Sequence, residues 1–419
     1  MTAEIVVYNR NAIALAADSA VTVGRKTYNS ANKLYMLSKY YPVGVLIYNS
    51  ARINNIPVEI IVKEYRKRLG RRCFDFLKEY KEDFVKFLRS FIQEQENEMD
   101  KKNSILVQLQ NMFYFVTSGP DVPQVQQGQD FFEEFNKHLD RVFDEISKIV
   151  PAEKNVDLTL VDIKTEMANI IRALMKIQDI NEQTLDKLEK LFPYYINMQG
   201  NPNVTGIAIC GYGEKEFMPK VYCFETLGFL NDCFKLTDTQ TNENTVEGVI
   251  PLAQRDMADL FISGIDDGVY KFIVKQYEDF IDDLFSETTQ ADAAFARYVK
   301  IYKSKVSEKI QGILTEEKIQ PLLNVIGILS KEELAELAES LVNLQALKHK
   351  MSLNIETVGG PIDVAIISKH DGFIWKKRKL YFDKDLNSHF FENYFSKDDN
   401  CDKIKTKGVD DDDLSGCKC

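Results

Sequence analysis

The first fifty residues constrain the fold most, because they hold two adjacent strand patterns at the start of the chain. Residues 2–9 alternate well enough to predict a strand. Residues 12–17 are almost wholly apolar, which is typical of a strand covered on both faces. The polar residues between these two runs predict a short hairpin connection. A further pair of strands is expected at 33–37 and 43–48, and a helix is expected to open at 49–51.

Three polar residues stand at the ends of these strands, namely Thr2, Asp18 and Lys33. A small residue in position 2 is what methionine aminopeptidases accept, so we expect Met1 to be removed and Thr2 to carry a free α-amino group. Each residue also has a structural interpretation. Asp18 is a common turn residue after a strand, Lys33 is a typical edge-strand charge, and threonine is common in position 2.

The chemistry explains why these residue types belong together. A threonine hydroxyl is a poor nucleophile until a base takes its proton, and a chain-terminal threonine carries its own base in the α-amino group. That amine has an ordinary pKa of about 7.7–8.0, so a substantial fraction is neutral near pH 7. The Lys33 ammonium favours the neutral amine, and Asp18 orients the lysine. The strand-to-helix corner expected at Asn49 can supply a backbone N–H to a tetrahedral intermediate.

The order of Thr2, Asp18 after one hairpin, Lys33, and a strand running into Ser50 resembles the proteasome β subunits. The resemblance is to bacterial proteasome-like proteases and their relatives among the N-terminal nucleophile (Ntn) hydrolases. It covers about residues 2–98, 204–265 and 330–380, and it implies an α+β fold, a four-layer αββα sandwich.

The resemblance also implies a substrate cleft and a set of supporting residues. The cleft is expected beside Asn49, Ser50 and Thr22, because the loop after Asp18 should pass there. Gln254 and Asp256 stand where such proteins use small hydroxyl residues to support the terminal threonine, and Glu356 and Thr357 lie near the place of a supporting Asp and Ser. These four are weaker candidates.

Composition excludes several other classes of function. The net charge of −11 argues against a general nucleic-acid or anionic-membrane surface. The chain has no run of about twenty apolar residues and no signal-peptide pattern, so neither a membrane span nor secretion is expected. Seven scattered cysteines indicate reduced thiols and a cytoplasmic location. The four histidines lie far apart, so we expect no metal site, and no cofactor is expected either.

Residues 1–395 are expected to form one Ntn-hydrolase-like domain with helical insertions at about 99–200 and 266–330. Residues 396–419 are acidic and contain Cys417 and Cys419, and we expect this tail to be disordered. Its last three residues look like a two-cysteine prenylation tail, although an exposed thiol pair or a partner-binding tip is the larger expectation.

The predicted function is therefore that of a threonine hydrolase that cleaves peptide or small amide bonds through an acyl-enzyme on Thr2. The alternative is a proteasome-like scaffold or assembly subunit without activity. A homo-oligomer is expected in either case. If the insertions fold over the sandwich, a small particle follows; if they project, their exposed apolar faces mark an assembly surface. The wide stripe at Phe131, Phe135 and Leu139 favours packing within one chain.

Overall fold

The computed structural model describes residues 2–23, 26–118, 129–150, 160–198, 204–286, 293–352 and 358–395. The chain divides into two units, Met1–Arg378 and Lys379–Cys419. In the second unit the described part contains helix α12 (Ser388–Phe395) and a cluster of phenylalanine rings. The tail at 396–419, with both of its cysteines, lies outside the described residues.

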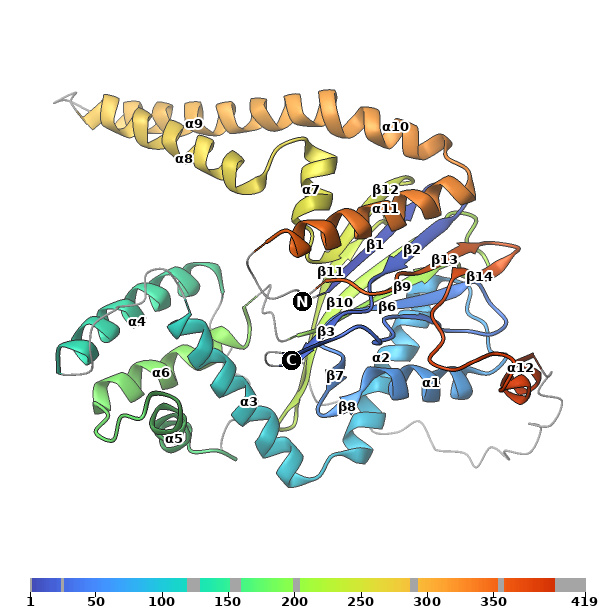
Figure 1. The fold of residues 1–419 in the computed structure, drawn as a ribbon. Helices are drawn as coiled ribbons and strands as arrows, with labels where there is room; N and C mark the ends of the chain where they lie inside the picture. Colours follow the sequence, from blue (N-terminus) through green and yellow to red (C-terminus); the bar gives the residue numbers. More distant parts are fainter. Residues whose placement is uncertain are drawn as a thin grey trace, which may run out of the picture. The chain divides into compact units, whose positions relative to one another are not determined.

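The first unit contains two five-stranded antiparallel sheets (Figure 1). The first has the strand order β12-β1-β2-β13-β14, and every residue of β1, β2 and β13 is buried, which explains their nearly continuous apolar sequences. Its strands are β1 (Ala3–Tyr8), β2 (Ile13–Ala17), β12 (Gly248–Ala253), β13 (Asp363–Ser368) and β14 (Gly372–Lys377).

The second sheet has the strand order β11-β10-β9-β6-β5. The predicted pairing of the strands on either side of residue 45 is present, since β5 pairs with β6. Its strands are β5 (Leu34–Met36), β6 (Val43–Asn49), β9 (Thr205–Gly211), β10 (Lys220–Leu230) and β11 (Cys233–Thr241). Two short hairpins add β3 (Val21–Val23) with β4 (Lys26–Tyr28), and β7 (Arg52–Ile53) with β8 (Ile56–Pro57).

Three clusters of buried apolar side chains hold these elements together. One contains side chains of both sheets, such as Leu15 and Leu46, and forms the core between them. Another joins the first sheet to α11 (Lys331–Lys350). The third joins the second sheet to α1 (Val58–Leu69) and α2 (Leu77–Gln95). The predicted α+β class is thereby confirmed.

One local prediction was wrong, because no helix opens at residues 49–51. The hairpin of β7 and β8 follows instead, and α1 begins only at Val58. Asn49, Asn54 and Asn55 have positive φ angles of 62°, 46° and 64°. Asparagine tolerates this left-handed conformation better than most residues and is common in tight turns. A left-handed residue cannot continue a right-handed helix.

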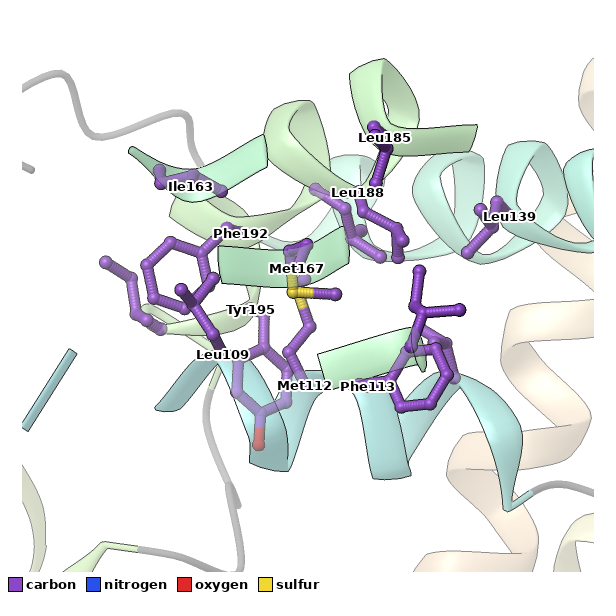
Figure 2. Close-up of a cluster of buried hydrophobic side chains, with 14 of the residues drawn as sticks. Leu109, Met112, Phe113, Leu139, Ile163, Met167, Leu185, Leu188, Phe192 and Tyr195 are labelled. Carbon is purple, nitrogen blue, oxygen red and sulfur yellow. The ribbon is translucent and has the colours of Figure 1, made fainter. Parts of the chain in front are cut away.

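A group of helices between β8 and β9 in the sequence packs into a cluster with its own core (Figure 2). Phe131, Phe135 and Leu139 are buried there, so the expectation that this stripe packs within one chain is confirmed. Residues of all four helices contribute to the cluster. They are α3 (Glu98–Thr117), α4 (Gln129–Ile149), α5 (Ile163–Met175) and α6 (Glu182–Tyr195).

A second group of helices precedes α11. The apolar side chains of α8 (Asp267–Ser286) are only partly buried, because Ile281 is 6% exposed whereas Phe280 is 62% exposed. Ser330 caps α11, and Glu333 completes the capping box. The group comprises α7 (Asp256–Ser263), α8 (Asp267–Ser286), α9 (Ala293–Leu314), the π-helical turn η1 (Thr315–Ile319) and α10 (Gln320–Ile328). Among the described residues, none of the helices has the length and apolar character needed to cross a bilayer.

Candidate active site

The candidate site lies where β1 begins, because three chain segments meet there. Antiparallel pairing sets Ala3 opposite Ala253 of β12 and Glu4 opposite Ala17 of β2. The carbonyl of Thr2 accepts a hydrogen bond from Gln254 N at 3.0 Å. Thr2 is therefore held as an extension of the sheet, and it is only 3% exposed.

Strand periodicity decides which way the residues of β1 face. Val6 and Tyr8 belong to the core between the two sheets, whereas Ala3, Ile5 and Val7 belong to the core under α11. Because side chains alternate along a strand, residues 2 and 4 lie on the side that faces the second sheet. Thr2 and Glu4 are consequently neighbours on one face.

Asp18 follows β2 and is completely buried. Its Oδ1 accepts hydrogen bonds from Ala3 N at 3.1 Å and from the Lys33 ammonium, with which it forms an ion pair. Its Oδ2 accepts from Ala20 N at 3.2 Å and from Gly359 N at 3.0 Å. A buried carboxylate requires this degree of compensation, and the contacts join three separate parts of the chain beside Thr2.

Lys33 stands at the entrance to β5 and is 4% exposed. Its carbonyl accepts a hydrogen bond from Ile47 N at 2.8 Å, which places the residue beside β6. Besides pairing with Asp18, its ammonium lies 3.5 Å from Glu4 Oε1. The lysine is therefore a buried cation between two carboxyl groups rather than a solvated edge charge.

Glu4 is the residue that sequence reasoning missed. Its Oε2 accepts a hydrogen bond from the Thr2 hydroxyl at 3.1 Å, and its carboxyl is fully buried. Burial raises the pKa of Glu4 to about 8, against the opposing effect of the Lys33 ammonium, and the nearby Asp18 charge raises it further. The available signal was an acidic residue two positions after Thr2 in an otherwise apolar strand.

Asn49 ends β6 and directs its backbone toward Thr2. Its N–H donates a hydrogen bond to Thr2 Oγ1 at 3.2 Å, and its φ of 62° gives the chain the orientation needed for this contact. This backbone donor lies on a turn and not at a helix start, and it points to the Thr2 hydroxyl.

The remaining predicted residues have more local contacts. Ser50 Oγ donates to Arg52 O at 3.0 Å and accepts from Arg52 N at 3.2 Å, so its hydroxyl closes the turn before β7. Thr22 lies in β3, where it pairs with Thr27, and its side chain is outside the described part.

Of the weaker candidates, Gln254 reaches the site through its backbone N–H. Asp256 pairs with Lys348 and accepts from Gln345, so it fastens the start of α7 to α11. Glu356 and Thr357 lie outside the described residues.

A cavity of about 610 Å³ is lined by polar residues from the starts of α7 and α8 and the end of α11. Gln254, Asp256 and His349 are among its lining residues, and burial lowers the pKa of His349. Gln254 also donates its backbone N–H to Thr2 O, but the Thr2 side chain faces the second sheet and not α11. Within the described ranges, no cluster of three or more histidine, cysteine or acidic side chains is arranged to hold a metal ion.

Comparison with known proteins gives no family for the chain. No protein-family model matches it, and no curated protein matches it. Two solved structures that are similar to it are Anbu from Hyphomicrobium sp. strain MC1 and the Anbu (Gly-1) mutant from the same strain. Each is 10% identical to this chain in sequence, and the alignment has a TM-score of 0.27. It covers 98% of this chain and 100% of the Anbu chain.

These comparisons contradict the predicted membership in the proteasome β-subunit-like, N-terminal nucleophile hydrolase family. A TM-score of 0.27 supports no shared fold, and no family model matches. The resemblance depended on Thr2, Asp18, Lys33 and the apolar strands between them, which are a small part of a chain of 419 residues. The chemistry of the site therefore has to follow from its own geometry.

Proposed function

We propose that the protein is a threonine hydrolase that cleaves amide bonds, including peptide bonds, through an acyl-enzyme on Thr2. The observation that carries the proposal is the environment of the Thr2 hydroxyl. Its oxygen accepts from Asn49 N and its proton faces Glu4, beside the Lys33–Asp18 ion pair. A buried hydroxyl with a carboxyl acceptor, a backbone donor and a buried cation nearby has the parts that nucleophilic catalysis needs.

Removal of Met1 is part of this proposal, because it gives Thr2 a free α-amino group that can act as a base. The buried Lys33 ammonium disfavours a second positive charge nearby and so keeps the amine neutral. Asp18 fixes both partners, since it binds the lysine and the backbone N–H of Ala3.

The substrate is proposed to lie beside Asn49, Ser50 and Thr22, with the N–H of Asn49 as one donor to the oxyanion of the tetrahedral intermediate. For the scaffold, we propose a four-layer αββα sandwich in which α11 covers the first sheet and the pair α1 and α2 covers the second.

Two measurements test this function on the purified native protein. Intact mass determines whether Met1 is absent, which we expect. Hydrolysis of a fluorogenic peptide-amide library is expected from the native protein, and Thr2→Ala should reduce it by about 10³-fold or more. The surface variant Thr165→Ala, which removes a hydroxyl from the start of α5, serves as the control and should retain full activity.

The second candidate is a scaffold without activity, and the exposed apolar side chains of α8 favour it. Val269, Phe272 and Phe280 are 50%, 63% and 62% exposed. Such side chains fit a surface for another copy of the chain. If the native protein hydrolyses the library no faster than Thr2→Ala does, Thr2 is not a nucleophile and the scaffold is the function that remains.

A further inference from the structure

Glu4 is a buried acidic group that accepts a hydrogen bond from the Thr2 hydroxyl, but the mechanism above does not assign it a proton transfer. A carboxyl group that is withdrawn from water loses its hydration, and a protein tolerates this where the group has partners or a function. Glu4 is 0% exposed, and among the described residues its Oε1 makes no hydrogen bond. The carboxyl is therefore less well compensated than that of Asp18.

The hydrogen bonds of Thr2 fix the direction of its proton. A threonine hydroxyl has one proton to donate and lone pairs to accept with. Its oxygen accepts from Asn49 N at 3.2 Å, a group that can only donate. When Glu4 is ionised its Oε2 can only accept, so the single hydroxyl proton goes to it at 3.1 Å, which is within the distance required of a general base.

The charges around Glu4 allow it to take up and release a proton. The Lys33 ammonium lies 3.5 Å from Oε1 and favours the carboxylate. Asp18 from the end of β2 favours the protonated acid, and burial does so more strongly. Burial raises the pKa of the Tyr48 phenol in β6, and the charge of Glu4 adds a smaller increase.

We propose that Glu4 is a catalytic residue, the general base that accepts the proton of the Thr2 hydroxyl. This inference rests on the proposed function. In acylation, Oγ1 forms a bond to the carbonyl carbon while its proton passes to Glu4 Oε2. The leaving amine takes that proton as the amide C–N bond breaks. In deacylation, Glu4 accepts a proton from water, the hydroxide attacks the ester, and Oγ1 leaves and recovers the proton.

The α-amino group and Glu4 are thus two candidate bases for one hydroxyl. Both would make the rate rise with pH, because both must be unprotonated: the pKa of Glu4 is raised to about 8, and an α-amino group has an ordinary pKa of about 7.7–8.0. The pH profile of the native protein therefore cannot separate them. Glu4→Gln can separate them. Its amide oxygen still accepts a hydrogen bond from the Thr2 hydroxyl, but an amide is too weak a base to take up the proton.

The test follows acylation of the Met1-free protein by p-nitrophenyl acetate between pH 6 and 10, measured as the initial burst of p-nitrophenolate. The burst of Thr2→Ala is subtracted as background. We expect Glu4→Gln to lower the maximal burst rate at least 100-fold, to change half-saturation less than threefold, and to lose the rise near pH 8. Glu4→Asp, which withdraws the carboxylate by one methylene, should lose at least tenfold.

Each outcome decides between the two hypotheses. The role of Glu4 is overturned if the maximal burst rate of Glu4→Gln lies within threefold of the native rate and rises with pH near 8 in the same way. The α-amino group would then be the base. No native burst above Thr2→Ala would contradict the proposed function itself. If Glu4→Gln does not give the native circular dichroism spectrum, Glu4→Asp decides, and an unchanged rate in that variant overturns the inference.

Discussion

Among single side chains, Lys33 balances the most buried charge in the candidate site. Its ammonium pairs with Asp18 and lies 3.5 Å from Glu4 Oε1, and all three side chains are almost inaccessible to water. Removing one partner from such a group leaves an uncompensated charge in the interior. The same residue should therefore support both stability and chemistry.

Lys33→Met is expected to lower the free energy of unfolding by about 3–5 kcal/mol, because Asp18 then loses its counter-ion. Urea denaturation measures this. The exposed pair of Lys63 with Glu59 provides the control, and Lys63→Met should change stability by less than about 1 kcal/mol. Equal effects of the two substitutions would show that the buried pair contributes nothing special.

Glu4 should also make stability depend on pH. Its pKa is raised from 4.5 to about 8 in the folded chain, chiefly by burial, so between these values the folded state holds a proton that the unfolded state has released. The contribution is fully present below pH 4.5 and is lost as the pH rises to about 8. The stability difference between the native protein and Glu4→Gln should fall by about 1.4 kcal/mol per pH unit in this window. A constant difference from pH 5 to 8 would contradict the assignment.

Thr2, Asp18 and Lys33 could be chosen as candidate site residues from the sequence, since each is a polar residue next to an apolar strand. Glu4 was missed because the alternating pattern of β1 does not say that the face with residue 4 is buried. That follows only from the pairing of β1 with β12 and β2 and from the core between the sheets. Contacts between distant segments decide the point.

Among the secondary-structure elements, the end of β6 matters most for the site. The sequence pattern predicted the strands at 2–9, 12–17, 33–37 and 43–48, but the helix expected at residues 49–51 is a turn. Asn54 shows why this was not predictable. Its side chain accepts from Phe229 N at 2.7 Å and donates to Phe229 O at 2.8 Å, so a strand 175 residues later stabilises the turn.

Substitution of Asn49 tests the turn and its contact with Thr2. Glycine adopts a φ of 62° without steric cost, whereas a β-branched residue pays about 1–2 kcal/mol there. Asn49→Gly should therefore keep acylation of Thr2 within a few-fold of native, and Asn49→Val should reduce it about tenfold or more. The burst assay measures both. Similar rates for the two variants would show that the backbone donor at this position is unimportant.

In the whole molecule, the two groups of added helices differ in how they cover their apolar faces. Residues of α3–α6 bury theirs in a common cluster, as Figure 2 shows. By contrast, α8 leaves several large apolar side chains exposed, including Phe272 and Phe280. The sequence predicted both helical insertions but not this difference, because burial depends on which helices pack together.

We expect the exposed face of α8 to support a small homo-oligomer. Light scattering on the native protein should give a particle of a few subunits, and the double variant Phe272→Glu with Phe280→Glu should shift it toward the monomer. Lys271→Gln with Lys275→Gln, at polar positions of the same helix, lowers the net charge by the same two units and provides the matched control. A particle of twelve or more subunits would contradict the small-oligomer prediction.

The central claim is that Thr2 is the nucleophile, and trapping its acyl-enzyme tests this most directly. The native protein is treated with p-nitrophenyl acetate, quenched with acid, and digested with pepsin at low pH, where the α-amino group is protonated and the acetyl group does not migrate to it; tandem mass spectrometry then locates the acetyl group. The account predicts one acetyl group on the Thr2 oxygen, in a chain lacking Met1, and its absence after mild hydroxylamine treatment, which cleaves esters but not amides. Acetylation confined to surface lysines, at equal levels in the native protein and Thr2→Ala, would contradict it.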